Sequence, residues 1–257
     1  MMEIAVKAAK EAGNILLDNL GKIKKIETKR QNNILSLVTN VDIKAEEKIC
    51  QIIREAYPEH DILSEERVKV SKNSDYKWII DPLDGTHNYI RGIPFFGICI
   101  ALAYQEDVLL GVIHLPLFNE MFKAEKGEGA YLNKEKIKVS RRALKESALV
   151  YDSDLHLSRA IMLDSLNRLA GRVFNVRMFG SSAQNLSFLA RGCVDLVIEY
   201  HDSPWDFSAG ALLVEEAGGK VTDFEGDKWK PEIGKYIASN GKIHDEVLKI
   251  LKPEIQD

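Results

Sequence analysis

The hydrophobic pattern of the chain changes its period along the sequence, and this change constrains the fold more than any other feature. Apolar residues recur at helical spacing over residues 2–20 and again from residue 42 to the Tyr57-Pro58 stop. Short apolar or alternating runs follow, separated by Asp, Gly and Pro, which is typical of strands joined by tight turns. They cover residues 77–80, 97–104, 108–114 and 121–126. The first half is therefore predicted to be α+β with an antiparallel sheet.

The second half alternates between the two periods and predicts an α/β arrangement. Helices are expected at residues 155–170, 182–191, 206–216 and 245–251, and strands at residues 173–178 and 194–200. A soft boundary at residues 139–147 divides the chain into a half of residues 1–142 and a half of residues 143–257. No long linker separates them, so we expect two abutting halves of one α/β protein.

Composition excludes several classes of function. Apolar residues make up 45% of the 257 residues and charged residues 29%, which permits a large core and a polar surface. The net charge of −4 is too small to predict nucleic-acid binding through bulk charge, and no apolar stretch is long enough to cross a bilayer. Cys50, Cys99 and Cys193 stand far apart in apolar runs and are expected to be buried thiols of a reducing compartment. We expect a cytoplasmic protein that requires neither nucleic acid nor a membrane.

The most informative segment joins an apolar run at residues 78–80 to two aspartates, Asp81 and Asp84. Asp-Pro at its start favours a type I turn, and Gly85 gives the backbone freedom at its exit. Such a turn brings the two carboxylates toward one point. At an effective dielectric constant near 20 they repel by about 4 kcal/mol, which a shared proton, a basic residue or a divalent cation must offset. No basic residue lies in the turn, and magnesium prefers oxygen ligands. A plain surface turn is the alternative.

Three further acidic features stand at the ends of expected elements. Glu65 and Glu66 follow a short apolar run, where one of such a pair is usually solvated. Asp42 opens the second helix and Asp206 opens the helix of residues 206–216, so each is also well placed as an ordinary N-cap. Spacing alone does not show that these acids meet.

These segments resemble the inositol monophosphatase family. Residues 81–86 (DPLDGT), with Asn88-Tyr89 and residues 92–94 after them, are similar to its first signature, and residues 205–210 (WDFSAG) to its second. Residues 37–42 and 63–66 resemble two further acidic segments, and the likeness runs in the family's order from the first helix to the last. The resemblance implies a layered α-β-α-β-α sandwich of the sugar-phosphatase type, with a metal site between the halves.

The same resemblance assigns a set of metal ligands. In the family, the residues that match Glu65, Asp81 and the Leu83 carbonyl hold one magnesium ion. Those that match Asp81, Asp84 and Asp206 hold a second, and a third ion is associated with Glu65. The implied cofactor is therefore two or three Mg²⁺ ions per active site.

The resemblance also assigns the chemistry. Asp42, Thr86 and Glu65 are the catalytic residues that it implies, with Thr86 and Asp42 together orienting and deprotonating the attacking water. The backbone at Gly85 and Thr86 grips the phosphate. The implied reaction is hydrolysis of a phosphate monoester by metal-activated water.

The substrate is the least constrained part of the prediction. By alignment, Ser182 and Glu199 fall where inositol-specific members hold inositol hydroxyls, and Asp84 also faces the substrate. Arg177 could contact a second phosphate or form an ordinary ion pair. We rank inositol 1-phosphate first, fructose 1,6-bisphosphate second, either alone or with dual specificity, and 3′-phosphoadenosine 5′-phosphate third. Ser64 of this chain stands where serine is frequent in the branch of the family that acts on the nucleotide. The expected partner is a small phosphorylated polyol or sugar.

Other family properties complete the expectations. The resemblance implies a homodimer and lithium inhibition through replacement of a loosely held magnesium ion. Some members bind the transcription apparatus, so a protein-binding module with residual or no catalysis is the alternative from a different class. The polar stretch at residues 29–36 is expected to be a mobile loop near the site, because this stretch helps to hold the extra metal ion in the family.

Overall fold

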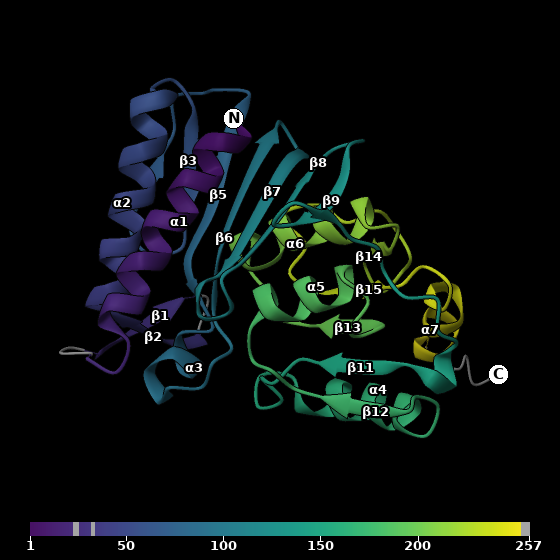
Figure 1. The fold of residues 1–257 in the computed structure, drawn as a ribbon. Coiled ribbons are helices and arrows are strands. Elements are labelled where there is room, and N and C mark those ends of the chain that lie inside the picture. The colour runs from purple at the N-terminus through teal and green to yellow at the C-terminus, as the bar shows by residue number, and fades with distance from the viewer. Residues whose placement is uncertain (23–25, 32–33, 253–257) are drawn as a thin grey trace.

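The computed structural model describes residues 1–22, 26–31 and 34–252 and shows five alternating layers of helices and sheets (Figure 1). Two helices cover one face of a large sheet, two lie between this sheet and a smaller one, and two cover the smaller sheet's outer face. These pairs are α1 (Met2–Asn19) with α2 (Asn40–Ala56), α5 (Ser182–Ala190) with α6 (Pro204–Glu216), and α4 (Arg159–Ala170) with α7 (His244–Leu251). The predicted α/β class and its α-β-α-β-α layering are confirmed.

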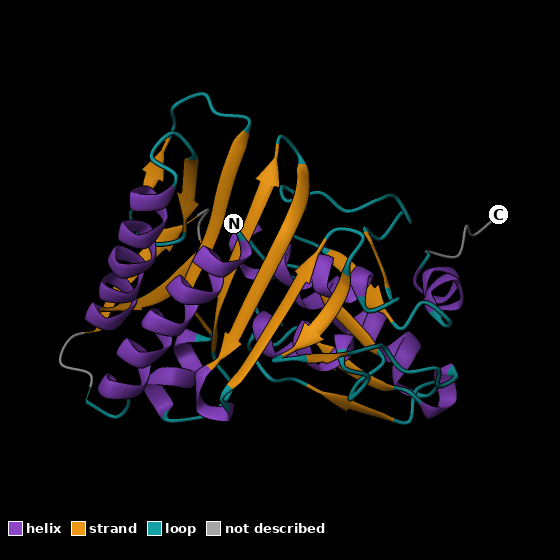
Figure 2. Ribbon diagram, turned by 45° about the horizontal axis from the view of Figure 1, so that its top comes forward, coloured by secondary structure: helices purple, strands orange, loops and turns teal. Residues whose placement is uncertain are grey.

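The large sheet has eight strands in the order β10-β9-β8-β7-β6-β5-β3-β4. Its long strands lie side by side across the molecule (Figure 2). Their bounds are β3 (Asp61–Ser64), β4 (Lys69–Val70), β5 (Tyr76–Asp84), β6 (Gly97–Tyr104), β7 (Asp107–Leu115), β8 (Glu120–Glu125), β9 (Gly129–Leu132) and β10 (Glu135–Lys136). The predicted antiparallel pairing holds for every neighbouring pair except β3 and β5, which run parallel. Because parallel strands end at the same edge of a sheet, the residue after Ser64 lies beside the end of β5.

The small sheet has five strands in the order β12-β11-β13-β15-β14. They are β11 (Ala148–Tyr151), β12 (Asn175–Arg177), β13 (Leu196–Glu199), β14 (Lys220–Thr222) and β15 (Tyr236–Ser239). β12, β11 and β13 are parallel, as the α/β prediction requires, and the other two pair antiparallel. The chain leaves β11 toward β12 on one side and reaches β13 on the other. In such sheets a crevice forms where the strand order reverses, at the carboxyl ends of the strands.

Close packing at two glycines fixes the position of α6 between the two sheets. A Cβ on Gly210 would lie 2.4 Å from Leu186 of α5, and one on Gly111 of β7 would lie 2.6 Å from the Ala209 carbonyl oxygen of α6. Larger side chains at either position would push α6 away from α5 or from the large sheet. The N-terminus of α6 therefore stays against the edge at which β5 ends.

Short elements join these layers. They are the helix α3 (Thr86–Arg91), the 3₁₀ turns at Pro116–Phe118 and Leu144–Glu146, and the hairpin of β1 (Ile26–Gln31) and β2 (Ile34–Thr39). The loop expected at residues 29–36 is wrong for residues 29–31 and 34–36, because these pair as antiparallel strands. Residues 32 and 33 lie outside the described part of the chain.

Two further expectations can be compared with the structure. Cys50 and Cys99 are buried as expected, but the expectation is wrong for Cys193, which is exposed directly after Gly192 in the turn between α5 and β13. Across the described residues, each helix is too short or too polar to cross a membrane. The division into halves of residues 1–142 and 143–257 stays a prediction.

Candidate active site

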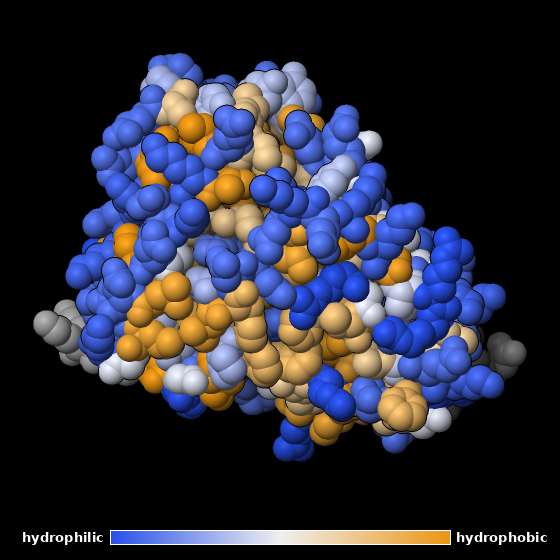
Figure 3. Space-filling view, viewed as in Figure 1, coloured by the Kyte–Doolittle hydropathy of each residue, from blue (hydrophilic) through white to orange (hydrophobic). Residues whose placement is uncertain are grey.

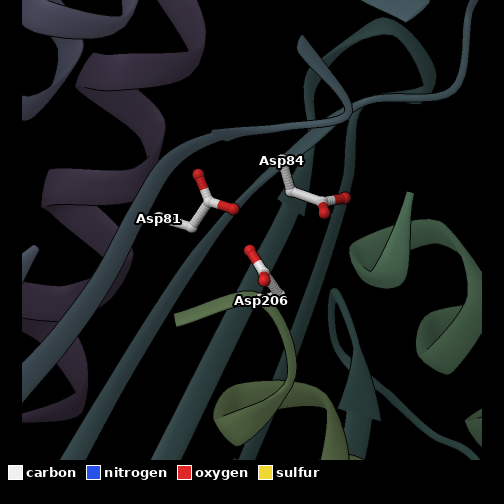
Figure 4. Close-up of side chains that lie close together, drawn as sticks. All are labelled: Asp81, Asp84 and Asp206. Atoms are coloured by element: carbon white, nitrogen blue, oxygen red, sulfur yellow. The ribbon is translucent and has the colours of Figure 1, made fainter. Parts of the chain in front are cut away.

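Three carboxylates from the two halves of the sequence meet where β5 ends against α6. Asp81 and Asp84 belong to β5, and Asp206 lies in the first turn of α6. Oxygen atoms of all three lie within 4.8 Å of one another. Asp206 points toward Asp81, and the Asp84 carboxylate beside them is turned away from both (Figure 4). The structure thus brings together three acids that sequence spacing alone could not connect.

An irregularity in β5 sets the positions of Asp81 and Asp84. Asp81 pairs with Cys99 and Asp84 with Gly97, so the register shifts between the two aspartates. Pro82 has no N–H to give to the ladder, and the Leu83 N–H donates to Asp81 Oδ1 over 2.9 Å instead. The predicted type I turn at residues 81–84 is therefore wrong: the strand continues to Asp84 through a bulge, because β6 pairs on both sides of it.

The N-terminus of α5 holds the Asp84 carboxylate. The Ala183 N–H donates to Oδ2 over 3.0 Å, the Ser182 N–H donates to Oδ1 over 3.2 Å, and the Ser181 hydroxyl also donates to Oδ2. These donors are the unpaired amides of the first helical turn and its N-cap hydroxyl. Asp84 thus ties the large sheet to the middle helical layer while one of its oxygens stays within 4.8 Å of the other two carboxylates.

Asp42 and Asp206 occupy equivalent positions at the starts of α2 and α6. Neither is the N-cap that the sequence reading offered as the ordinary alternative: the caps are Thr39 and Ser203, and each aspartate is the third helical residue of a capping box. Asp42 Oδ2 accepts the Thr39 N–H over 3.0 Å, and Asp206 Oδ2 accepts the Ser203 N–H over 2.5 Å. In both residues the capping contact uses Oδ2, and Oδ1 is the oxygen left for other contacts.

The Thr86 hydroxyl links Asp42 to the end of β5. Thr86 Oγ1 lies 3.3 Å from Asp42 Oδ1 and 3.0 Å from the Leu83 carbonyl oxygen, and it can donate to either. Gly85 precedes it in the left-handed region with φ of 81°, where a Cβ would lie 2.7 Å from the Phe95 carbonyl oxygen. Glycine is therefore required at this position to turn the chain from β5 into α3.

Glu65 enters the site from the neighbouring strand. Ser64 is in register with Ile80, and the Glu65 N–H donates to the Ile80 carbonyl over 3.1 Å, which places Glu65 beside Asp81. Glu65 lines the same cavity as the three aspartates, and its negative charge raises the pKa of Asp81. It does not belong to the group of three whose oxygens lie within 4.8 Å of one another.

Burial and mutual repulsion raise the pKa of each carboxyl in this group. Burial is the largest cause for Asp81 and Asp206, and neighbouring carboxylates add to it, so both pKa values lie well above the usual range. Burial also raises the pKa of Asp84 to about 6, against the lowering effect of its three donors. Burial raises the pKa of Asp42 to about 6. The metal-free site therefore retains protons at pH values where exposed aspartates are ionised.

The carboxylates form one wall of a cavity of about 720 Å³, at the crevice that the order of the small sheet predicts. Ser182 and Glu199, two expected substrate residues, lie on its lining. The Glu199 side chain is 4% exposed and accepts from Asn185 Nδ2 over 2.7 Å. Arg177 is exposed on β12, donates to the Val176 carbonyl and is not among the residues that line the cavity.

Sequence reasoning missed three residues of the substrate side. Asp202 accepts from the Ser182 hydroxyl over 3.0 Å and from the Tyr236 hydroxyl over 2.9 Å, and burial raises its pKa to about 8. Asp152 lies 3.1 Å from His201 Nδ1, and both line the cavity. The run of residues 199–202 contains two acids and a histidine at the end of a strand, so its composition could have marked it as part of the site.

The donor set fits a hard divalent cation. Its ligand atoms are carboxylate oxygens, two of the three aspartates are almost fully buried, and their mutual repulsion is the interaction that a cation would reverse. Oxygen-only ligands are those that magnesium uses in enzymes that act on phosphate groups. Fold and site together therefore indicate a metal-dependent enzyme that acts on phosphate esters.

Comparison with known proteins gives the family. The model of the inositol monophosphatase family matches residues 1–256, and the chain belongs to that family. It is 35% identical to the fructose-1,6-bisphosphatase/inositol-1-monophosphatase of Thermotoga maritima over all of this chain and 97% of that one. It is 36% identical to Nus factor SuhB of Haemophilus influenzae over 98% of this chain and 96% of that one.

Solved structures share the fold, and one of them holds Mg²⁺ and phosphate. The extragenic suppressor protein SuhB from Bartonella henselae superposes with a TM-score of 0.93 at 34% identity, covering 99% of each chain. An IMPase/NADP phosphatase solved with Mg²⁺ and phosphate has a TM-score of 0.83 at 26% identity, covering 96% of this chain and 92% of that one. The chain is a phosphoric monoester hydrolase of a metal-dependent family.

Proposed function

We propose that this protein hydrolyses inositol 1-phosphate to inositol and phosphate in a Mg²⁺-dependent reaction. One observation carries the proposal: the three aspartates of the cluster line a single cavity together with Thr86, Ser182 and Glu199, and Asp42 Oδ1 lies 3.3 Å from Thr86 Oγ1. The carboxylates suit a phosphate with its metal ions, and Ser182 and Glu199 suit the hydroxyl groups of a small polyol.

The proposed metal ligands are the carboxylates of the site and one backbone carbonyl. Glu65, Asp81 and the Leu83 carbonyl would hold one Mg²⁺ ion, and Asp81, Asp84 and Asp206 a second, with a third ion beside Glu65. When bound, Mg²⁺ ions neutralise charge on the phosphate and lower the pKa of water. The Leu83 carbonyl oxygen lies 3.0 Å from Thr86 Oγ1 in this structure, so the single hydroxyl proton can go to it or to Asp42. A ligand role for the carbonyl would leave that proton for Asp42.

Thr86 and Asp42 can move the proton of the attacking water. Thr86 Oγ1 donates to Asp42 Oδ1, which leaves the lone pairs of the hydroxyl oxygen to accept from a water molecule. A proton taken from the water would pass to Asp42, whose pKa of about 6 suits a base near neutral pH. The backbone N–H groups of Gly85 and Thr86, at the start of α3, would hold the phosphate oxygens.

The lining of the cavity favours a monophosphate. Glu199, Asp202 and Asp152 belong to it, and carboxyl groups form hydrogen bonds with hydroxyl groups. No Lys or Arg stands among the described residues that line the cavity, so a second phosphate would have no ammonium or guanidinium partner there. Fructose 1,6-bisphosphate is the second candidate substrate, because the Thermotoga maritima relative carries both activities in its name. 3′-Phosphoadenosine 5′-phosphate ranks third. Arg177, which could contact a second phosphate, is exposed on β12 and is not among the residues that line the cavity.

Phosphate release with Mg²⁺ from the three esters tests the substrate. We expect the highest kcat/KM on inositol 1-phosphate. Glu199→Gln should raise KM for that ester by about 10-fold or more, since an NH₂ group replaces the carboxyl oxygen that is left to bind a substrate hydroxyl. Glu216→Gln is the matched control, because Glu216 binds the N–H groups of Gly127 and Gly129 outside the cavity. A higher kcat/KM on fructose 1,6-bisphosphate, unaffected by Glu199→Gln, would contradict the substrate assignment.

A second proposed function is protein binding, favoured by the likeness to relatives named as Nus factors. It is separable from catalysis, because Asp84→Asn should abolish hydrolysis and leave a protein-binding surface intact. Three family properties are proposed with it: a homodimer, lithium inhibition that competes with Mg²⁺, and a cytoplasmic location. Sedimentation at twice the mass of one chain tests the first, and lithium inhibition that Mg²⁺ does not relieve would contradict the second.

A further inference from the structure

The carboxylate of Glu46 is buried at the back of the site and is bound to the loop that follows β3. Glu46 lies on α2 and is 1% exposed. Its Oε1 accepts N–H bonds from three consecutive residues over 3.1, 3.0 and 3.3 Å, and Oε2 accepts a further bond over 3.2 Å. The donors are the backbone amides of Glu66, Arg67 and Val68. Glu46 does not line the cavity, so it has no route to the substrate.

This loop carries Glu65 into the site. The Ser64 N–H donates to the Val68 carbonyl over 2.9 Å and closes the loop, and the Glu65 N–H donates to Ile80 over 3.1 Å. The amides of the residues after Glu65 turn inward, and the Glu46 carboxylate is their acceptor. A buried carboxylate bound to three amides defines the backbone path of the loop, and so the place from which the Glu65 side chain starts.

The same helix also carries Asp42, one turn before Glu46. Residues four apart on a helix lie on one face, and here one reaches Thr86 while the other binds the loop of Glu65. α2 therefore joins the two sides of the site as a rigid support.

We infer that Glu46 is a positioning residue that holds Glu65 where it can bind Mg²⁺. The inference rests on the proposed function, since it needs Glu65 to be a metal ligand. Without the Glu46 carboxylate, the three amides would need other acceptors, and the loop could adopt other paths. Mg²⁺ affinity should fall because Glu65 is no longer pre-organised, although Glu46 itself never contacts the ion.

Calorimetric titration of the metal-free full-length protein with Mg²⁺ alone tests this inference. Glu46→Ala should weaken Mg²⁺ binding by about 10-fold or more, as loss of an outer support of a metal ligand typically does. Glu46→Gln, which keeps one acceptor oxygen, should lose less. Glu47→Ala is the matched control: the same residue type on the same helix, but exposed. It should bind as the wild type does.

A double-mutant cycle with Glu65→Gln separates positioning from general loss of structure. If Glu46 acts through Glu65, the double variant binds Mg²⁺ no more weakly than Glu65→Gln alone. Unchanged Mg²⁺ affinity in a folded Glu46→Ala variant would overturn the inference, and so would fully additive losses. If Glu46→Ala does not fold, the same cycle with Glu46→Gln decides. If the wild type binds Mg²⁺ and hydrolyses the ester, and the Glu46 variant binds Mg²⁺ equally well, this inference alone is refuted. If the wild type neither binds Mg²⁺ nor hydrolyses the ester, the proposed function is refuted.

Discussion

Removing one charge from the aspartate cluster should reverse the stability order of wild type and variant when Mg²⁺ is added. Three carboxylates whose oxygens lie within 4.8 Å form three repelling pairs. At an effective dielectric constant near 20, each pair repels by about 3.5 kcal/mol, so the fully ionised group carries about 10 kcal/mol of repulsion. This equals the total stability of many domains, which is about 5–15 kcal/mol.

Asp206→Asn removes two of the three pairs with little change in shape. The amide oxygen can still accept the Ser203 N–H, so the capping box of α6 is kept. The upper limit of the gain is about 7 kcal/mol. Protons held by the remaining carboxyls, whose pKa values are raised, reduce it. We expect at least about 1 kcal/mol in metal-free protein at mildly alkaline pH, or about 2–4 °C in Tm.

Thermal unfolding in EDTA and then in excess Mg²⁺ measures both halves of the prediction. The wild type should gain about 2.7 kcal/mol at a Mg²⁺ concentration of about 100 times Kd, and Asp206→Asn should gain much less. Asp18→Asn, an exposed change of the same charge on α1, should follow the wild type in both conditions. An Asp206→Asn protein that melts below the wild type in EDTA, yet gains as much from Mg²⁺, would refute the idea that repulsion in this cluster is what the cation relieves.

Two further predictions concern stability away from the metal ligands. Burial lowers the pKa of His244 to about 4, and hydroxyls lie 2.9 Å from both of its ring nitrogens. The unfolded chain therefore binds this proton first, and stability should fall as pH drops from about 6.5 toward 4. Urea midpoints should show this slope in the wild type, and an equal slope in His244→Asn would contradict it. Asn88 Nδ2 lies within 3.1 Å of three backbone carbonyl oxygens and joins α3 to the segments before β6 and α5. Asn88→Ala should lower the free energy of unfolding by about 1–3 kcal/mol, and an unchanged urea midpoint would show that this contact contributes nothing.

The long periodic elements were predictable from the sequence, and the short ones were not. The pattern over residues 2–20 and the run at residues 97–104 correspond to α1 and β6, because each buries one clear apolar face or run. β14 and β15 have three and four residues, too few to show a period. The hairpin of β1 and β2 was missed because the residues of β1 after Ile26 are all polar, although β2 contains four apolar residues.

Some residues of the candidate site were also predictable from the local sequence, and others were not. The run of residues 78–86 marks Asp81 and Asp84 by itself, since an apolar strand leads straight into both acids. That Asp206 joins them depends on α6 packing against a sheet more than a hundred residues earlier in the chain, and only the family likeness predicted it. Local patterns do contain the capping boxes: Thr39 and Ser203 each stand three residues before an aspartate.

Some of the assignments depend on tertiary contacts that no local pattern encodes. Glu46 reads as one more polar helix residue, and its role appears only when the loop after β3 folds over it. Arg177 shows the opposite case, a residue with suitable chemistry that the fold leaves exposed on β12.

The most direct test of the account is the initial rate of phosphate release from inositol 1-phosphate, measured for the wild type and Asp84→Asn as Mg²⁺ is removed and restored. The account predicts that EDTA stops release by the wild type, that Mg²⁺ restores it, and that the folded variant is slower by about 10²-fold or more in Mg²⁺. Release that continues in EDTA, or an Asp84→Asn variant with wild-type rates, would contradict the claim that this cluster of carboxylates carries out the reaction.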